Sequence, residues 1–213
     1  MIDYYAQRAA EYEQIYQRPE RQVDLRILEG RLGQAFPGEQ VLEIACGTGY
    51  WTQFIAKEAK AIRATDFNAE VIQLAEQKSY ASCDVTFQQA DAYTLANVEG
   101  SYTAGFAGFW WSHLPITRIA DFLHVFHARL QSGARVILVD NLYVEGSSTP
   151  LSHTDQDGNT YQMRQLQDGS RHEVLKNFPS EVDLRQHLAP FASQITYTAL
   201  MYYWVVQYIV PKD

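Results

Sequence analysis

The stretch Val41-Leu-Glu-Ile-Ala-Cys-Gly-Thr-Gly-Tyr50 decides how this sequence of 213 residues is interpreted. It begins with a short apolar run, which contains an acid at Glu43, and then turns at Gly47 and Gly49. A buried strand, a glycine turn and a helix start in this order are typical of a nucleotide site, because glycine lets the backbone approach a ligand closely. The stretch therefore predicts an α/β fold with a binding site where its first strand ends.

Two further acids occupy matching places on the next predicted strands. Asp66 follows the apolar segment 61–65, and Asp91 follows the segment 85–89. Because the carboxyl ends of parallel strands meet at one edge of a sheet, we expect Glu43, Asp66 and Asp91 on the same rim. Three carboxylates there suit a cationic nucleoside and suit a pyrophosphate poorly.

The first two thirds of the chain alternate between helical and strand patterns. This alternation predicts a parallel sheet with helices on both faces. The predicted elements are helices 3–17 and 19–35, strand 40–44, helix 50–58, strand 61–65, helix 69–78 with Asn68 as its cap, strands 85–89 and 102–108, helix 115–130 and strand 135–140.

The pattern changes beyond Asp140. Segment 145–157 is polar and predicts a loop, and segments 160–166 and 170–176 flank Asp168-Gly169, which indicates a β-hairpin. Ser180 with Asp183 predicts a capped helix start, and two strands follow at 195–200 and 202–210, one of them antiparallel. The whole pattern predicts a three-layer, Rossmann-like, mostly parallel seven-stranded sheet, with N-terminal helices and an inserted β-hairpin.

Composition restricts the class of protein. The chain is 46% hydrophobic and 20% charged, as in ordinary globular proteins. Its net charge of −8 argues against a nucleic-acid partner, since phosphate contacts need a basic face. Two cysteines, Cys46 and Cys83, form no disulfide framework, no apolar run reaches the ~18–20 residues of a membrane helix, and the start lacks a signal peptide. We therefore expect a cytoplasmic protein without a membrane partner.

The glycine turn does not fit two common phosphate sites. Counted from Gly47 and Gly49, the third glycine of a dinucleotide fingerprint falls on Thr52, and Glu43 would repel the phosphates. No Lys-Ser or Lys-Thr pair follows the turn, which excludes an ATP-type phosphate loop.

On these residues the chain resembles the class I (Rossmann-like) S-adenosylmethionine-dependent methyltransferases over residues 40–142. That family's first motif, acid-x-Gly-x-Gly-x-Gly, stands here as Glu43-Ile-Ala-Cys-Gly-Thr-Gly49, with Ala45 in place of the first glycine. The resemblance implies S-adenosyl-L-methionine as the cofactor, with Asp66 on the ribose and Asp91 beside the adenine. The implied cofactor-binding residues are Glu43, Ala45, Cys46, Gly47, Thr48, Gly49, Asp66, Phe67, Asp91, Ala92, Ala107 and Tyr12.

The resemblance also places the acceptor side near segment 106–113. It implies a substrate pocket with Trp110, Trp111 and Tyr143, although two adjacent tryptophans point in different directions, so that one packs in the core. His113 is the candidate general base, which is needed only if the acceptor is protonated when it binds. A small-molecule acceptor is expected, and no residues have the spacing of a metal site.

The resemblance further implies one domain in four parts. These are an N-terminal helical lid (1–38), a donor-binding core (40–142), an inserted loop and hairpin (143–180) and a C-terminal helix with strands (181–213). The hairpin covers the acceptor pocket or mediates self-association as a homodimer. Two other functions remain open: a non-catalytic sensor or scaffold that binds the nucleoside, and a nicotinamide-dependent oxidoreductase.

Overall fold

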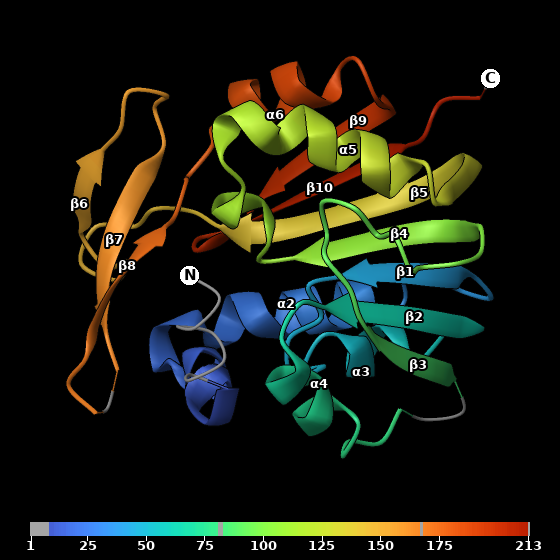
Figure 1. The fold of residues 1–213 in the computed structure, drawn as a ribbon, viewed down its shortest axis with the longest axis horizontal. Coiled ribbons are helices and arrows are strands. Elements are labelled where there is room, and N and C mark those ends of the chain that lie inside the picture. Colours follow the sequence, from blue (N-terminus) through green and yellow to red (C-terminus); the bar gives the residue numbers. More distant parts are fainter. Residues whose placement is uncertain (1–8, 81–82, 167, 213) are drawn as a thin grey trace.

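The computed structural model describes residues 9–80, 83–166 and 168–212, with side chains from residue 13 onward. Within these residues a seven-stranded sheet occupies the centre, in the order β3-β2-β1-β4-β5-β10-β9 (Figure 1). Its strands are β1 (Gln40–Ile44), β2 (Ala61–Asp66), β3 (Asp84–Gln89), β4 (Tyr102–Gly108), β5 (Leu130–Asn141), β9 (Ser193–Ala199) and β10 (Tyr203–Ile209). The helices are η1 (Ala9–Gln17), η2 (Pro19–Arg21), α2 (Gln22–Leu32), α3 (Thr52–Ile55), α4 (Ala69–Ala75), η3 (Trp111–His113), η4 (Ile116–Arg118), α5 (Ile119–His127) and α6 (Glu181–Leu188). The predicted α/β fold is confirmed.

Strands β1 to β5 of this sheet are parallel. β1 lies between β2 and β4, with Val41 opposite both Ile62 and Ala104. Since both faces are covered at the centre of the sheet, β1 and β4 are buried along most of their length, whereas β3 at the sheet edge alternates between exposed and half-buried residues. β10 is antiparallel to both β5 and β9, which confirms one antiparallel strand near the end of the chain. The carboxyl ends of β1, β2 and β4 therefore share one edge.

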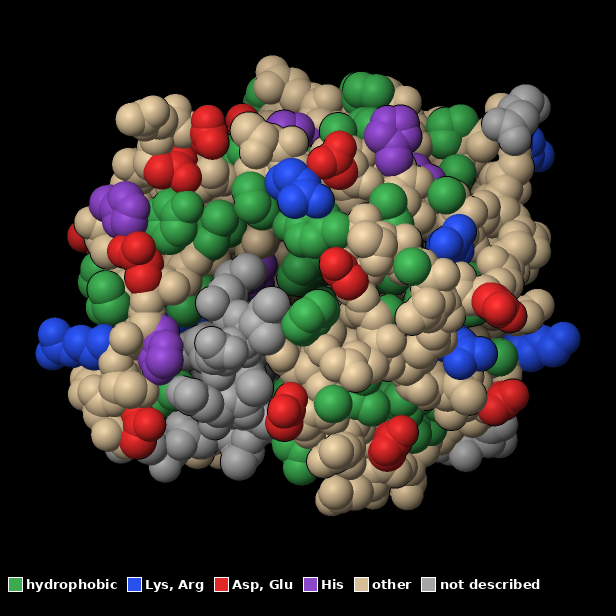
Figure 2. Space-filling model, viewed as in Figure 1, with side chains coloured by type: hydrophobic (Ala, Val, Ile, Leu, Met, Phe, Trp, Pro, Cys, Tyr) green, Lys and Arg blue, Asp and Glu red, His purple; other side chains and the backbone are tan. Residues whose placement is uncertain are grey.

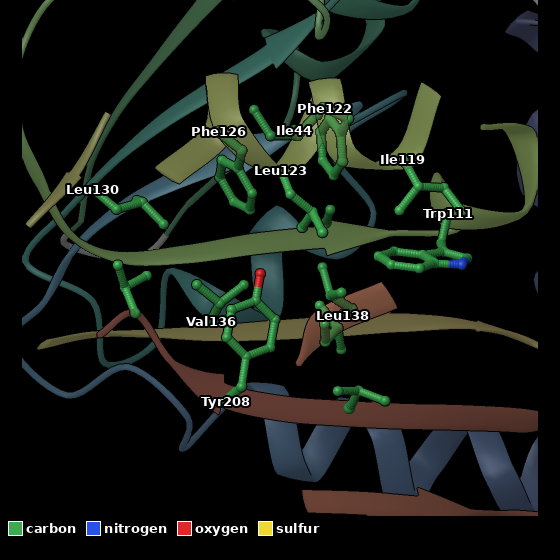
Figure 3. Close-up of a cluster of buried hydrophobic side chains, with 14 of the residues drawn as sticks. Ile44, Trp111, Ile119, Phe122, Leu123, Phe126, Leu130, Val136, Leu138 and Tyr208 are labelled. Carbon is green, nitrogen blue, oxygen red and sulfur yellow. The ribbon is translucent and has the colours of Figure 1, made fainter. Parts of the chain in front are cut away.

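Each face of the sheet carries its own apolar cluster. On one face Phe122 and Phe126 of α5 pack on Val136 and Leu138 of β5 (Figure 3). On the other face α2 and α3 cover the same strands, with Leu28 among the buried residues there. This packing fixes the edge at which the strands end.

A second sheet of three strands, β6 (Leu151–Thr154), β7 (Thr160–Gln165) and β8 (Arg171–Leu175), lies beside the strand ends (Figure 1, orange). The predicted hairpin is confirmed, since β7 and β8 pair antiparallel on either side of Gly169, whose φ is +87°. The prediction of a loop over 145–157 is wrong, because β6 forms within it and pairs with β7.

Several predicted helices are shorter in the structure. The helix expected over 115–130 is η4 followed by α5, and Leu130 already belongs to β5. The helices expected over 50–58 and 69–78 are α3 and α4, and the described part of the first helix, η1, is a 3₁₀-helix. Asn68 stands at the N-cap of α4, as predicted, but its side chain makes no capping hydrogen bond. At α6 the cap is confirmed, because Ser180 and Asp183 form a capping box.

Acidic and basic side chains are interspersed over the face drawn in Figure 2. Among the helices of the described residues, none combines the length and apolar character that a membrane crossing requires.

Candidate functional site

The turn after β1 has left-handed backbone at three positions. Ala45, Gly47 and Gly49 have φ values of +54°, +55° and +74°. Glycine adopts this region freely, whereas an L-residue such as Ala45 does so at a cost of about 1 kcal/mol. A Cβ at Gly49 would stand 2.4 Å from the hydroxyl of Tyr80. The turn therefore needs glycine at Gly49, while Ala45 tolerates its conformation.

Asp66, the last residue of β2, holds this turn in place. Its Oδ2 accepts a hydrogen bond from the Gly47 N–H at 2.9 Å, and its Oδ1 accepts one from the Asn68 N–H at 2.9 Å. Burial raises the pKa of the Asp66 carboxyl, and the backbone donors oppose this increase. Because each carboxylate oxygen has two lone-pair sites, Asp66 can accept further hydrogen bonds from hydroxyl groups.

A cavity of about 260 Å³, here called the rim cavity, opens where β1, β2, β3 and β4 end. It brings together many of the residues that the sequence predicted, although they lie on four different segments of the chain. Its lining residues are Ala45, Gly47, Thr65, Asp66, Phe67, Asn68, Val71, Ala90, Asp91, Ala92, Tyr93, Phe109, Trp110 and His113.

Thr65, Val71, Tyr93 and Phe109 line the rim cavity without having been predicted from the sequence. Thr65 precedes Asp66, and Tyr93 follows Asp91 by two positions. This proximity to predicted site residues is the sequence feature that could have identified Thr65 and Tyr93 as part of the site. Phe109 follows β4 directly and has a φ of +59°, which is unusual for a bulky residue. Nothing in the sequence marks this conformation.

Glu43 does not line the rim cavity. It is buried, and its Oε2 accepts a hydrogen bond from the Thr52 hydroxyl at 2.7 Å. Burial raises its pKa to about 8, so Glu43 is largely protonated at neutral pH. The expectation of three carboxylates on the rim is therefore corrected to two, Asp66 and Asp91.

Other predicted contacts also lie away from the rim cavity. Cys46 and Ala107 are buried in the two apolar clusters, and the Thr48 hydroxyl donates to Glu13 Oε1 of η1 at 2.7 Å. Gly49 lies against Tyr80. The side chain of Tyr12 falls outside the described residues.

The three residues predicted for the substrate pocket lie in three different places in the structure. Trp110 lines the rim cavity, whereas Trp111 is buried in the apolar cluster under α5 and α6. The two tryptophans thus point in different directions, and Trp111 is the one in the core. Tyr143 is 42% exposed, packs edge-on against Phe178, and lines neither described cavity.

His113 is buried at the inner end of the site. Its Nδ1 lies 2.8 Å from the Leu175 carbonyl oxygen, which only accepts hydrogen bonds, so Nδ1 carries a proton. Burial lowers the pKa of the ring well below its ordinary value, and the charges of Lys176 and Arg164 lower it further. At neutral pH the ring is therefore uncharged, with Nε2 as an acceptor.

A second cavity of about 580 Å³, here called the outer cavity, shares Phe109 and His113 with the rim cavity. It lies between η1, η2, the end of β5 and the small sheet. Its lining residues are Gln14, Ile15, Tyr16, Arg18, Arg21, Phe109, His113, Asn141, Ser147, Ser148, Thr149, Gln162, Met163, Arg164, Gln165, Leu166, Lys176, Phe178 and Tyr203.

A buried polar network anchors the small sheet to the main one. Lys176 Nζ donates to Asp140 Oδ1 at 3.0 Å and to the Ser112 hydroxyl at 2.5 Å. Burial lowers the pKa of Lys176 to about 8, although Asp140 opposes this. Burial would raise the pKa of Asp140, but the Lys176 charge and backbone donors keep it below its usual range. The wall of the outer cavity is thus fixed to β5.

Among the described residues, no group of three or more His, Cys, Asp or Glu side chains is placed to hold a metal ion. The expectation of a site without metal stays a prediction.

Comparison with known proteins identifies related chains. A family described as a methyltransferase domain matches residues 41–133. Malonyl-[acyl-carrier protein] O-methyltransferase of Serratia marcescens is 31% identical over 80 residues, 38% of this chain and 27% of that protein. Demethylmenaquinone methyltransferase of Lactiplantibacillus plantarum is 30% identical over 106 residues, 47% of this chain and 44% of that protein. The chain thus matches less than half the length of these curated relatives.

Structural comparison extends over the whole chain. The solved complex of DhpI with SAH (S-adenosylhomocysteine) superposes on this chain with a TM-score of 0.80 and 25% sequence identity. The alignment covers 100% of this chain and 96% of DhpI. The likeness therefore includes the segments outside 41–133, where the small sheet lies.

Proposed function

We propose that the chain, which matches a methyltransferase-domain family over residues 41–133 and has the fold of the DhpI–SAH complex, transfers a methyl group from S-adenosyl-L-methionine to a small-molecule acceptor. The observation that carries this proposal is the pair of cavities that meet at Phe109 and His113. A donor in the rim cavity and an acceptor in the outer cavity would meet at these two residues.

The residues of the rim cavity fit this donor. Asp66 has acceptor sites for the ribose hydroxyls, and Asp91 keeps acceptor sites for the adenine amino group while its Oδ1 holds the Tyr93 N–H at 2.8 Å. Val71 and Ala92 offer apolar walls for a purine ring. When bound, S-adenosylmethionine supplies an electrophilic methyl group on a positively charged sulfur.

The protein's own contribution is alignment and exclusion of water. Holding two reactants in line lowers the barrier by several kcal/mol, because the entropy of encounter is lost on binding and not in the reaction. Phe109 at the junction of the cavities and Trp110 in the rim cavity are largely apolar surfaces that would exclude water. If the acceptor binds in protonated form, His113 Nε2 is the acceptor for its proton.

The test of donor binding is calorimetry with S-adenosylhomocysteine. We expect roughly micromolar affinity, about 8 kcal/mol, for the natural chain. Asp66→Ala should weaken it at least about tenfold, since the variant loses acceptors for two hydroxyl groups. Asp84→Ala is the matched control, because Asp84 is an exposed acid at the opposite end of the sheet and should leave the affinity unchanged. Equal affinities in both variants would refute the site.

Catalysis is tested separately from binding. Labelled S-adenosylmethionine is incubated with small acids, amines, phenols and quinones, and transfer to any of them identifies a methyltransferase. A chain that binds the donor tightly but transfers to no acceptor in the panel would instead support the non-catalytic sensor.

A further inference from the structure

The outer cavity has a charge opposite to that of the protein. The chain carries 25 acidic and 17 basic residues, with a net charge of −8. Yet the described residues that line the outer cavity include Arg18, Arg21, Arg164 and Lys176 and no Asp or Glu. A cleft lined by one sign of charge concentrates ligands of the opposite sign.

Arg21 is the most constrained of these cations. Its side chain is 8% exposed, and its guanidinium donates to Asn141 Oδ1 and to the Ser147 hydroxyl, both at 3.1 Å. The guanidinium carbon lies 5.1 Å and 5.6 Å from the ring centres of Tyr202 and Tyr203. These contacts hold the group at one orientation on the cavity wall.

No carboxylate is in direct contact with Arg21. Within the described residues no Asp or Glu forms an ion pair with it, and its Nε is buried without a hydrogen-bond partner. The nearest link to an acid runs through the Ser147 hydroxyl, which accepts from Arg21 and donates to Glu20 Oε1 at 3.3 Å. A buried cation without a directly bound counter-ion is incompletely compensated, so an anion in the outer cavity would stabilise it.

The other cations divide into two groups. Lys176 is already paired with Asp140, so it shapes the wall and adds a smaller field. Arg18 precedes η2 and forms an exposed ion pair with Glu20 at 3.9 Å. Arg164 belongs to β7 and donates to Gln162 Oε1 at 2.9 Å. Arg21 and Arg164 thus offer planar, multiply donating groups from two separate elements.

We infer that the acceptor is a small oxyanion, a carboxylate or a phosphorus oxyacid, whose charged group is bound by Arg21 together with Arg164. This inference rests on the proposed function, which assigns the outer cavity to the acceptor. Planar guanidinium groups match the oxygen pairs of both anion types. His113, which is neutral, adds no charge of its own.

The inference is tested by anion binding to the full chain, with and without S-adenosylhomocysteine. Propionate and methylphosphonate are the probes, propionamide is the neutral counterpart, and sodium chloride keeps the ionic strength equal. Thermal unfolding should show concentration-dependent stabilisation by one or both anions and none by propionamide. The two anions distinguish a carboxylate from a phosphorus oxyacid as the preferred group.

Variants locate the binding groups. Arg21→Gln and Arg164→Gln should each weaken anion binding at least about tenfold. Arg171→Gln is the control for Arg164→Gln, because Arg171 is exposed on the neighbouring strand β8 and does not line the outer cavity. Circular dichroism shows whether each variant is folded. If Arg21→Gln does not fold, Arg164→Gln tests the anion site in its place.

The outcomes separate this inference from the proposed function. Retained affinity for S-adenosylhomocysteine in Arg21→Gln and Arg164→Gln, with loss of anion binding, supports both. If the natural chain does not bind S-adenosylhomocysteine, the proposed function is refuted. The oxyanion site can still be tested in that case, because anion binding is also measured in the absence of S-adenosylhomocysteine. Equal binding of propionamide and propionate, or unchanged anion binding in both variants, overturns the oxyanion site.

Discussion

At the scale of single residues, backbone strain concentrates at the rim cavity. Ala45 and Phe109 both line this cavity and both have left-handed φ values, +54° and +59°. Such conformations cost on the order of 1 kcal/mol or more in an L-residue and persist where surrounding contacts fix them. The Phe109 N–H donates to the Val139 carbonyl at 2.7 Å, which is one such contact. Such contacts, against the cost of the strained backbone, keep the ring of Phe109 at the junction of the cavities.

Glu43 gives a prediction about pH. Its pKa is about 8 in the folded chain, because of burial, against an ordinary value of 4.5. The folded state therefore keeps a proton between pH 4.5 and 8 that the unfolded state releases, so stability falls as pH rises through this window. Relative to Glu43→Gln, the natural chain should lose up to about 5 kcal/mol between pH 4.5 and 8. Urea unfolding at pH 5, 6.5 and 8 measures this, and parallel pH profiles for the two chains would contradict it.

At the scale of elements, the distance between β4 and α5 depends on one glycine. A Cβ at Gly105 would stand 2.6 Å from Phe126 Cζ and 3.0 Å from Leu130 Cδ1. Both neighbours are buried in the apolar cluster drawn in Figure 3, so neither moves without disturbing it.

We therefore expect Gly105→Ala to lower the free energy of unfolding by about 1–3 kcal/mol, through overpacking. Gly30→Ala is the matched control, because Gly30 is exposed in α2 with no atom within 4 Å of an added Cβ. That control should raise the free energy by up to about 1 kcal/mol, since alanine favours helix. Denaturant unfolding of both variants measures the two effects, and stabilisation by Gly105→Ala would show that β4 and α5 are packed loosely.

The elements that the sequence predicts well are those with a local signal. β1 and β4 have the predicted ends, because an apolar run stops at turn residues on both sides. β6 was missed because all four of its residues are exposed and lack an alternating pattern. Its partner, β7, supplies the hydrogen bonds that make it a strand, and such pairing is not visible in a local window.

At the scale of the whole molecule, the rim cavity was largely predictable and the outer cavity was not. The residues of the rim cavity follow the ends of successive strands, so parallel-sheet geometry alone brings Asp66 and Asp91 together. The cations of the outer cavity, Arg21 and Arg164, are more than 140 positions apart and look like isolated surface charges in the sequence. Only the tertiary fold brings both side chains to the outer cavity.

Ligand binding should stabilise the folded chain as a whole. S-adenosylhomocysteine at 100 times its Kd adds about 2.7 kcal/mol. For a chain of this length the Tm should then rise by roughly 5–10 °C. NADH at the same concentration should leave the Tm unchanged, because the third glycine of a dinucleotide fingerprint is missing and Thr52 stands in its place. A shift with NADH and none with S-adenosylhomocysteine would favour the oxidoreductase alternative.

The position of β10 between β5 and β9 has a consequence for biosynthesis. β9 is made before β10, yet within the described sheet it is joined to the other strands only through β10. The outer part of the sheet therefore cannot assemble until residues 203–209 have emerged from the ribosome. Until then one edge of β5 is unpaired, and an unpaired strand edge is a site at which nascent chains can associate.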